Sequence, residues 1–132
     1  YKGLYNHFNI GAYTTKNMSS TERGLWWAKG AGTGATSYGR PWNTIEKSLS
    51  GGASYYSGNY LTNNQYTYYT KKFNVMNGLN EVATHQYMTN TSGGESEGRI
   101  LRYAYEADDD YPIVFHIPVY SGMPSKVCEK PE

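Results

Sequence analysis

Residues 43–60 have the sequence NTIEKSLSGGASYYSGNY, and this stretch decides the fold class. Asn43 is a favourable N-cap residue, and Glu46, three residues later, completes the pattern of a capping box. Apolar side chains then recur at every third or fourth position, which places them on one face of a helix. These side chains are Ile45, Leu49, Ala53, Tyr56 and Tyr60. The spacing predicts a helix from Thr44 to about Tyr60.

Two adjacent glycines, Gly51 and Gly52, lie in the middle of this predicted helix. Each is expected to cost roughly 1 kcal/mol relative to alanine in a helix interior. We interpret them as positions where a neighbouring element packs closely against the helix backbone.

Further elements are predicted on both sides of this helix. A shorter helix capped by Ser20 or Thr21 is expected to end before Gly30, and another is expected over residues 96–107. Residues 64–76 are rich in tyrosine and other β-formers, and residues 111–120 contain two prolines that suit only an edge strand. The sequence therefore predicts an α+β domain that is mainly helical with a small β component.

Composition limits the classes of function. The 132 residues carry 12 Lys and Arg against 11 Asp and Glu, so the net charge of +1 does not indicate a nucleic acid or an anionic membrane as partner. No apolar run approaches the ~20 residues that a membrane span needs. The 15 Tyr, 3 Trp and 3 Phe supply the apolar area for a core in a single domain of residues 1–132.

Motifs for metal, phosphate or serine chemistry are missing from the sequence. The three histidines have no paired zinc-binding spacing, and the single cysteine cannot form a metal cluster or an intrachain disulfide. The glycine-rich residues 30–34 lack the lysine and the preceding strand of a phosphate-binding loop. We therefore expect neither a metal nor a cofactor.

Carboxylates are the remaining candidates, because glycoside hydrolysis usually requires a carboxylic acid of raised pKa. Each glutamate also has an ordinary structural explanation. Glu46 suits a helix cap, Glu22 suits the first turn of a helix, and Glu95 and Glu97 suit a helix N-terminus. From the residues alone, none of them is identified as the acid.

Residues 84–90, THQYMTN, form the densest cluster of polar and aromatic side chains. One interpretation is the wall of a sugar-binding cleft. The other is a buried turn whose tyrosine and histidine satisfy backbone groups, and the pattern alone does not separate the two.

Several stretches resemble glycoside hydrolase family 73, the bacterial endo-β-N-acetylglucosaminidase modules of autolysins. YNHFNIGAY at residues 5–13 is similar to the family's YNxFxIGAY, and HQYMTN at residues 85–90 is similar to its HQYMTN. Four more stretches follow the family's order within residues 5–124. They are RPWNTIEK at 40–47, GGA at 51–53 with YL at 60–61, QYTYY at 65–69 with KFN at 72–74, and FHIPVY at 115–120 with MP at 123–124.

The resemblance implies a lysozyme-like α+β fold and cleavage of the β-1,4 bond after N-acetylglucosamine in peptidoglycan. It also implies a catalytic glutamate in an L-E-[TS]-G-x-G motif placed before the YNxFxIG stretch. This motif is not present in residues 1–132. We therefore expect the chain to be the C-terminal two-thirds of such a module, completed by an N-terminal segment that carries the acid, and to be inactive alone.

The resemblance also suggests site residues. Tyr87 matches the family's cleft tyrosine, and we expect it to orient the substrate's N-acetyl group or a water molecule. Glu22 is a weak candidate for a second catalytic acid. The expected substrate-binding residues are Asn6, Phe8, Trp42, Tyr66, Tyr68, His85, Gln86 and Asn90, with structural roles equally open for Phe8 and Trp42.

Two other functions remain open at this point. One is a non-catalytic glycan-binding domain that uses the same aromatic groove, and the other is a muramidase on the same fold. The expected partner is the glycan strand of peptidoglycan, without nucleic acid or membrane. Because peptidoglycan lies outside the cell membrane, we expect a secreted or cell-wall protein.

Overall fold

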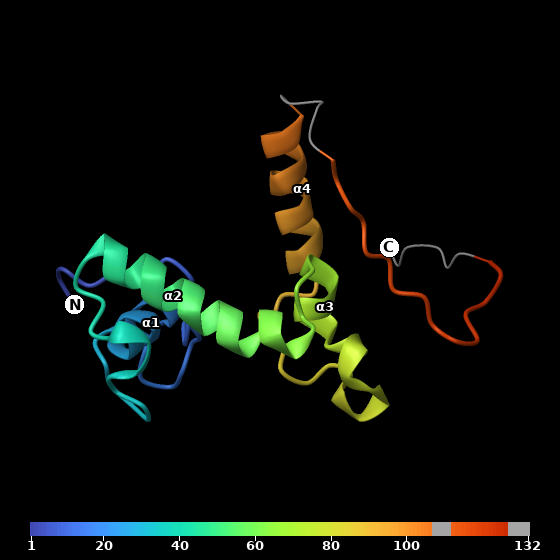
Figure 1. Ribbon diagram of the computed structural model, residues 1–132. Helices are drawn as coiled ribbons and strands as arrows, with labels where there is room; N and C mark the ends of the chain where they lie inside the picture. Colours follow the sequence, from blue (N-terminus) through green and yellow to red (C-terminus); the bar gives the residue numbers. More distant parts are fainter. Residues whose placement is uncertain (107–111, 127–132) are drawn as a thin grey trace.

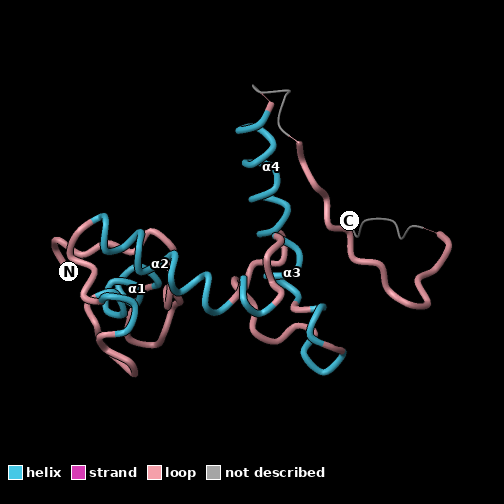
Figure 2. The backbone as a smooth tube through the Cα atoms, in the orientation of Figure 1, coloured by secondary structure: helices cyan, strands magenta, loops and turns pink. Residues whose placement is uncertain are grey.

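The computed structural model describes residues 1–106 and 112–126. These residues form four α-helices: α1 (Ser20–Ala28), α2 (Ile45–Asn59), α3 (Tyr68–Phe73) and α4 (Gly93–Tyr105). In Figure 1, α1 packs beside the first half of α2, which then runs outward to α3, where α4 rises steeply. Figure 2 shows helices and loops but no strand in the described part of the chain. The domain is mainly helical.

Helix α1 is fixed at its start by a capping box. The Ser19 hydroxyl accepts the backbone N–H of Glu22, and the Glu22 carboxylate accepts the backbone N–H of Ser19 at 2.9 Å. The predicted helix is confirmed, but its cap lies one residue before the predicted Ser20 or Thr21.

Helix α2 is also confirmed, with a different cap from the predicted one. The Thr44 hydroxyl accepts the Lys47 N–H at 3.2 Å, whereas Asn43 binds the Lys47 ammonium. The predicted apolar face is partly wrong, because Ile45 and Leu49 are exposed. The buried face carries small residues instead, namely Ser48, Gly51 and Gly52.

Close packing against this small-residue face holds the N-terminal half together. A Cβ atom added at Gly51 would collide with the Tyr38 carbonyl and the Trp42 indole, and one added at Gly52 would collide with the Phe8 ring. Trp42 is fully buried beside Ile10 and Ala28. The interpretation of the two glycines as close-packing positions is confirmed.

Residues 64–76 differ from the prediction of an extended strand. Thr67 and Thr70 form a capping box that begins α3, and the Asn74 backbone ends the helix in the left-handed conformation. Tyrosine-rich sequences suit a strand only where neighbouring strands pair with them. In residues 68–73 the capping box stabilises a helix instead of a strand.

The C-terminal predictions are also corrected. Helix α4 begins at Gly93, before the predicted residue 96. Residues 112–120 form no strand, although they follow an irregular extended course beyond α4 (Figure 1). The predicted helix end at residue 107 and strand start at residue 111 lie outside the described residues. The predicted β component is therefore not found in the part that the structure describes.

We expect Gly51→Ala to destabilise the protein by about 1–3 kcal/mol, because the new methyl group overfills the contact with Trp42 and Tyr38. Gly58→Ala is the matched control in the same helix, since no atom lies within 4 Å of its added Cβ. That change should stabilise by up to about 1 kcal/mol through helix propensity. Chemical denaturation of both variants measures the difference, and equal effects would contradict the close-packing role.

Candidate functional site

A cluster of tyrosine rings lies where α2 ends. Tyr87 meets the rings of Tyr56 and Tyr60 edge-on, with centroid distances of 5.4 and 5.2 Å. Tyr56 and Tyr60 stack on each other at 5.6 Å, one helical turn apart. The end of α2 thus gives Tyr87 a rigid aromatic support.

The loop that carries Tyr87 is pinned to α3 by buried polar groups. The Tyr87 N–H donates to the Lys71 carbonyl at 3.0 Å. The His85 ring stacks on Tyr60 and lies 2.8 Å from Gln65 Oε1 through Nδ1. The Lys72 ammonium donates to Gln86 Oε1 at 2.5 Å. His85 and Gln86, which directly precede Tyr87, are therefore held by Gln65 and Lys72.

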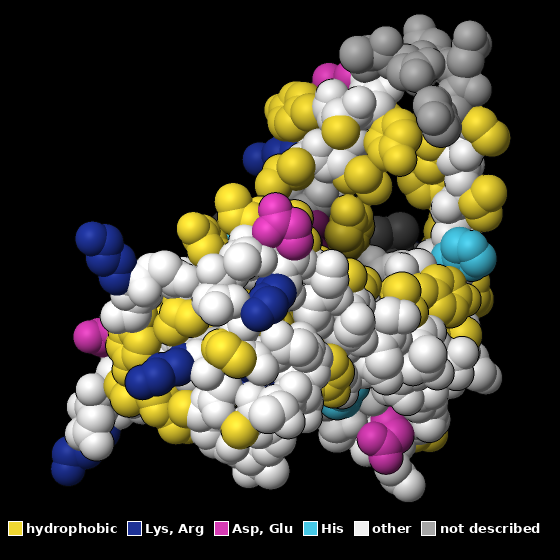
Figure 3. Space-filling model, turned by 60° about the vertical axis from the view of Figure 1, so that its left-hand side comes forward, with side chains coloured by type: hydrophobic (Ala, Val, Ile, Leu, Met, Phe, Trp, Pro, Cys, Tyr) yellow, Lys and Arg dark blue, Asp and Glu magenta, His cyan; other side chains and the backbone are white. Residues whose placement is uncertain are grey.

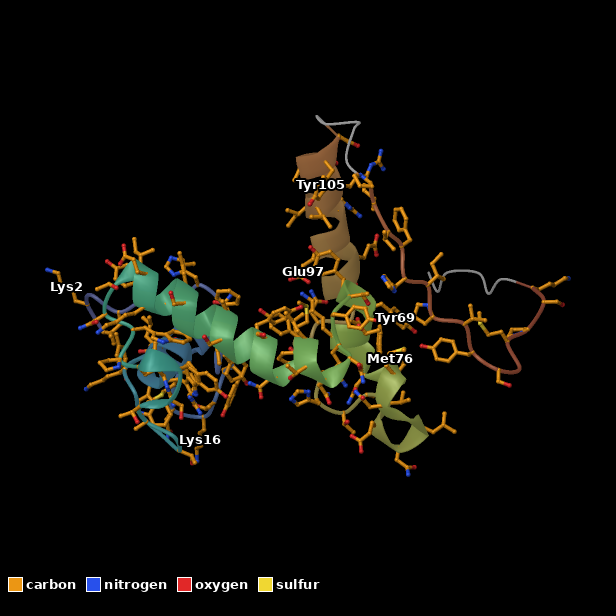
Figure 4. The ribbon with its side chains drawn as sticks, viewed as in Figure 1. Lys2, Lys16, Tyr69, Met76, Glu97 and Tyr105 are labelled. Carbon is orange, nitrogen blue, oxygen red and sulfur yellow. The ribbon has the colours of Figure 1, made fainter. Side chains whose placement is uncertain are left out.

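An ion pair joins α3 to α4 beside Tyr87. Lys71 Nζ lies 2.5 Å from Glu97 Oε2, with side-chain exposures of 6% for Lys71 and 33% for Glu97. The ammonium also lies over aromatic rings, 4.5 Å from the Tyr87 centroid and 4.7 Å from the Tyr68 centroid. Figure 4 labels Glu97 near the base of α4, above α3. The buried cation thus has both a carboxylate and ring faces as partners.

Two cavities meet at this cluster. The larger, of about 1210 Å³, lies between the end of α2, α3, α4 and residues 112–116, and the smaller, of about 780 Å³, lies between residues 7–13 and 83–89. Figure 3 shows hydrophobic side chains gathered around a hollow beside α4. Three residues line both cavities: Phe8, Tyr87 and Glu97.

Burial raises the pKa of the tyrosine hydroxyls of the cluster above the ordinary value of about 10. Desolvation is the main cause that raises the pKa of Tyr87, and the nearby Glu97 charge adds to it. Burial likewise raises the pKa of Tyr56 and of Tyr60 to about 12. These hydroxyls are therefore hydrogen-bond donors at neutral pH.

Several of the predicted binding residues lie at these cavities. Phe8, Tyr66 and Tyr68 line the larger cavity with Tyr87, and Gln86 lines the smaller one. Tyr66 is exposed and meets His116 edge-on at 5.5 Å. The structure thus brings residues from distant motifs to one surface.

Other predicted residues are occupied elsewhere. Trp42 is fully buried, and its indole N–H donates to the Tyr38 carbonyl at 2.8 Å, so it has no face free for a sugar. The Asn6 amide donates to the Ile10 and Gly24 carbonyls and holds the N-terminal loop to α1. The Asn90 side chain accepts the Ser92 N–H before α4.

Glu22 does not lie with Tyr87. It is exposed in the capping box of α1, and its hydrogen bonds to Ser19 lower its pKa. Such a carboxyl stays ionised at neutral pH, which is unsuited to a general acid.

Sequence reasoning missed Lys71 and undervalued Glu97. Glu97 was explained as an anion near a helix start, and only the packing of α4 on α3 brings it to Lys71. The available signal was a lysine placed among tyrosines in residues 65–73. Among residues 1–106 and 112–126, no group of three or more His, Cys, Asp or Glu is arranged to hold a metal ion. None of the described helices has the length and apolar character to cross a membrane.

The tyrosine cluster predicts a loss of stability at alkaline pH. The unfolded chain releases these phenolic protons near pH 10, whereas folded Tyr56 and Tyr60 hold them to about pH 12. The contribution of these two groups to stability should therefore be complete below about pH 10 and be lost between about pH 10 and 12, by up to about 1.4 kcal/mol per pH unit for each group.

Tyr56→Phe and Tyr60→Phe should each reduce this slope, measured by denaturation at a series of pH values. Tyr103→Phe, which removes an exposed hydroxyl from α4, is the control. An unchanged slope in both cluster variants would contradict the assignment.

Comparison with known proteins places these residues in a wider context. No model of a known protein family matches the chain, and no solved structure matches it. The chain is similar to proteins named bifunctional autolysin from Staphylococcus aureus strains Mu50 and N315, with 28% identity over 116 residues in each. The match covers 88% of this chain and 8% of each autolysin, so the chain spans about a twelfth of the length of these relatives. The chain is distantly related to a small region of a bacterial autolysin.

Proposed function

We propose that this chain is part of a cell-wall hydrolase, an endo-β-N-acetylglucosaminidase that cleaves the β-1,4 bond after N-acetylglucosamine in peptidoglycan. The distant similarity to bifunctional autolysins supports a wall-degrading protein. The resemblance of residues 5–124 to glycoside hydrolase family 73 supports the specific bond. A secreted or cell-wall location and a lysozyme-like fold belong to the same proposal.

The observation that carries the proposal is the tyrosine-lined cavity around Tyr87. Exposed ring faces such as those of Tyr66 and Tyr69 offer apolar platforms for the C–H faces of sugar rings. The neutral Tyr87 hydroxyl adds a hydrogen-bond donor to this cavity, and the Glu97 carboxylate adds an acceptor. A glycan strand requires this alternation of apolar faces and hydrogen-bonding groups.

We further propose that the general acid belongs to a segment outside residues 1–132. A general acid needs a raised pKa, but hydrogen bonds at the helix caps lower the pKa of Glu22 and of Glu46. Glu97 faces Lys71, and Glu106 pairs with Arg102 at 2.8 Å. In this arrangement the chain supplies the binding wall and Tyr87, and the added segment supplies the acid.

A non-catalytic glycan-binding domain is the second candidate. The observation that favours it is the same pairing of the cavity carboxylates with cations, because a binding groove needs acceptors but no protonated acid. A muramidase would cut the other β-1,4 bond, and the sugar at the reducing end of the released fragments distinguishes the two hydrolases.

Residues 1–132 alone should bind purified peptidoglycan but release no reducing ends from it. A missing general acid typically removes about 10²–10⁴-fold of rate. Sedimentation with insoluble peptidoglycan measures binding, and a reducing-sugar assay measures cleavage. Efficient cleavage by the isolated chain would overturn the proposed external acid, and failure to bind would overturn the glycan-binding wall.

Tyr87→Phe tests the role of the hydroxyl in the protein that joins this chain to the acid-bearing segment. If the hydroxyl orients the N-acetyl group or a water in the transition state, kcat should fall about 100-fold, or about 3 kcal/mol. Stability should change little, because the hydroxyl makes only a long 3.4 Å bond to the Phe8 carbonyl within the described residues.

Tyr60→Phe is the control for this measurement, since Tyr60 packs on Tyr87 without lining either cavity. It should keep its turnover. The opposite pattern for Tyr87→Phe, a loss of about 1 kcal/mol of stability with normal turnover, would assign the hydroxyl a structural role instead.

A further inference from the structure

Glu97 occupies a distinct position among the described carboxylates, because it lines both cavities beside Tyr87. A ligand that passes from one cavity to the other would lie against this side chain. Figure 4 shows Glu97 at the base of α4, near the end of α2 and the start of α3. This position makes Glu97 a residue that a ligand in the cavities would contact. The charges around Glu97 indicate which chemical group of the ligand it would bind.

The negative charge of Glu97 is balanced by the buried ammonium of Lys71. Lys71 Nζ lies 2.5 Å from Glu97 Oε2, and the lysine side chain is only 6% exposed. The cation is enclosed by the rings of Tyr56, Tyr68 and Tyr87. A ligand at the exposed side of Glu97 therefore meets a strong acceptor without an excess of negative charge around it. This setting favours a neutral hydrogen-bond donor over a cation.

Apart from Lys71, aromatic rings lie beside the carboxylate. Phe8 and Tyr87 line the same two cavities, and Tyr56 lines the larger one. An acetamido group carries an N–H donor and a methyl group side by side, so it presents a partner for the carboxylate and a partner for the rings together. A hydroxyl offers only the donor.

We propose that Glu97 accepts a hydrogen bond from the acetamido N–H of an N-acetylated amino sugar, with Lys71 holding the carboxylate in place. This inference rests on the proposed glycan function and assigns the group that selects the N-acetylated sugar. The alternative is an ion pair that only fastens α4 to α3. Such a pair would not distinguish between ligands.

The test compares two ligands on the unaltered chain by calorimetry. One is the β-1,4 tetramer of N-acetylglucosamine, and the other is its 2-O-acetyl counterpart, in which an ester oxygen replaces each N–H. The shape and the methyl group are kept while the donor is lost. We expect the N-acetyl tetramer to bind at least tenfold more tightly, because an ionised acceptor left without its donor is costly.

Glu97→Gln provides the matching change in the protein. It should weaken binding of the N-acetyl tetramer about tenfold and leave binding of the 2-O-acetyl tetramer nearly unchanged, because the loss concerns a charge-assisted bond. Glu95→Gln is the control on the same helix, since Glu95 is exposed and pairs only with Arg99 among the described residues. It should bind both ligands as the unaltered chain does.

The outcomes separate this inference from the function on which it rests. Equal binding of the two tetramers by the unaltered chain would overturn the role of Glu97 and leave glycan binding intact, and so would an unaffected Glu97→Gln variant. Failure of the unaltered chain to bind either tetramer would overturn the proposed function itself. If Glu97→Gln does not fold, equal binding of the two tetramers by the unaltered chain still overturns the inference.

Discussion

The close approach of Phe8, Tyr38 and Trp42 to the backbone of α2 is the constraint on which the structure depends. The chain is poor in aliphatic side chains, so large flat rings must supply the buried area. Rings pack this tightly against a helix only where the helix has no side chains in the way, and Gly51 and Gly52 provide that space. Because this contact fixes the middle of α2, it also sets where the C-terminal end of the helix, with Tyr56 and Tyr60, meets Tyr87.

At the C-terminal end of α2, a second group of rings packs around a charged side chain instead of around glycines. Here a buried lysine lies among tyrosines and is balanced by Glu97. A buried ion pair gains little net stability, because removing two charges from water offsets their attraction. The ion pair instead sets the orientation of α4 on α3, and this orientation determines which carboxylate faces the cavities. The contact at the middle of α2 thus stabilises the fold, whereas the contacts at its C-terminal end orient residues that line the cavities.

The sequence predicted the helices better than it predicted the site. Periodicity and capping residues located α1, α2 and α4 to within a few residues, because these signals are local. Helix α3 was mistaken for a strand, since the β preference of its tyrosines outweighed the less familiar Thr67–Thr70 capping box. Placement of Tyr66 and Tyr68 near Tyr87 followed from the resemblance, whereas the pairing of Lys71 with Glu97 depends on helix packing and leaves no local pattern. For Trp42 the sequence leaves a binding role and a structural role open, because an aromatic residue has the same local pattern in a core and in a groove, and the structure buries it.

Tryptophan and tyrosine side chains are unevenly distributed between the core around Gly51 and the cavities around Tyr87. All three tryptophans fall within residues 26–42, where Trp27 and Trp42 meet edge-on at 5.0 Å. The cavities around Tyr87 have tyrosine but no tryptophan among their described lining residues. Tryptophan emission therefore reports the packing around Gly51 and Gly52, whereas the surroundings of Lys71 contribute only to the tyrosine signal, together with tyrosines such as Tyr38 and Tyr55 that pack on Trp27. A ligand that occupies the cavities should therefore perturb the tyrosine absorbance more than the tryptophan emission.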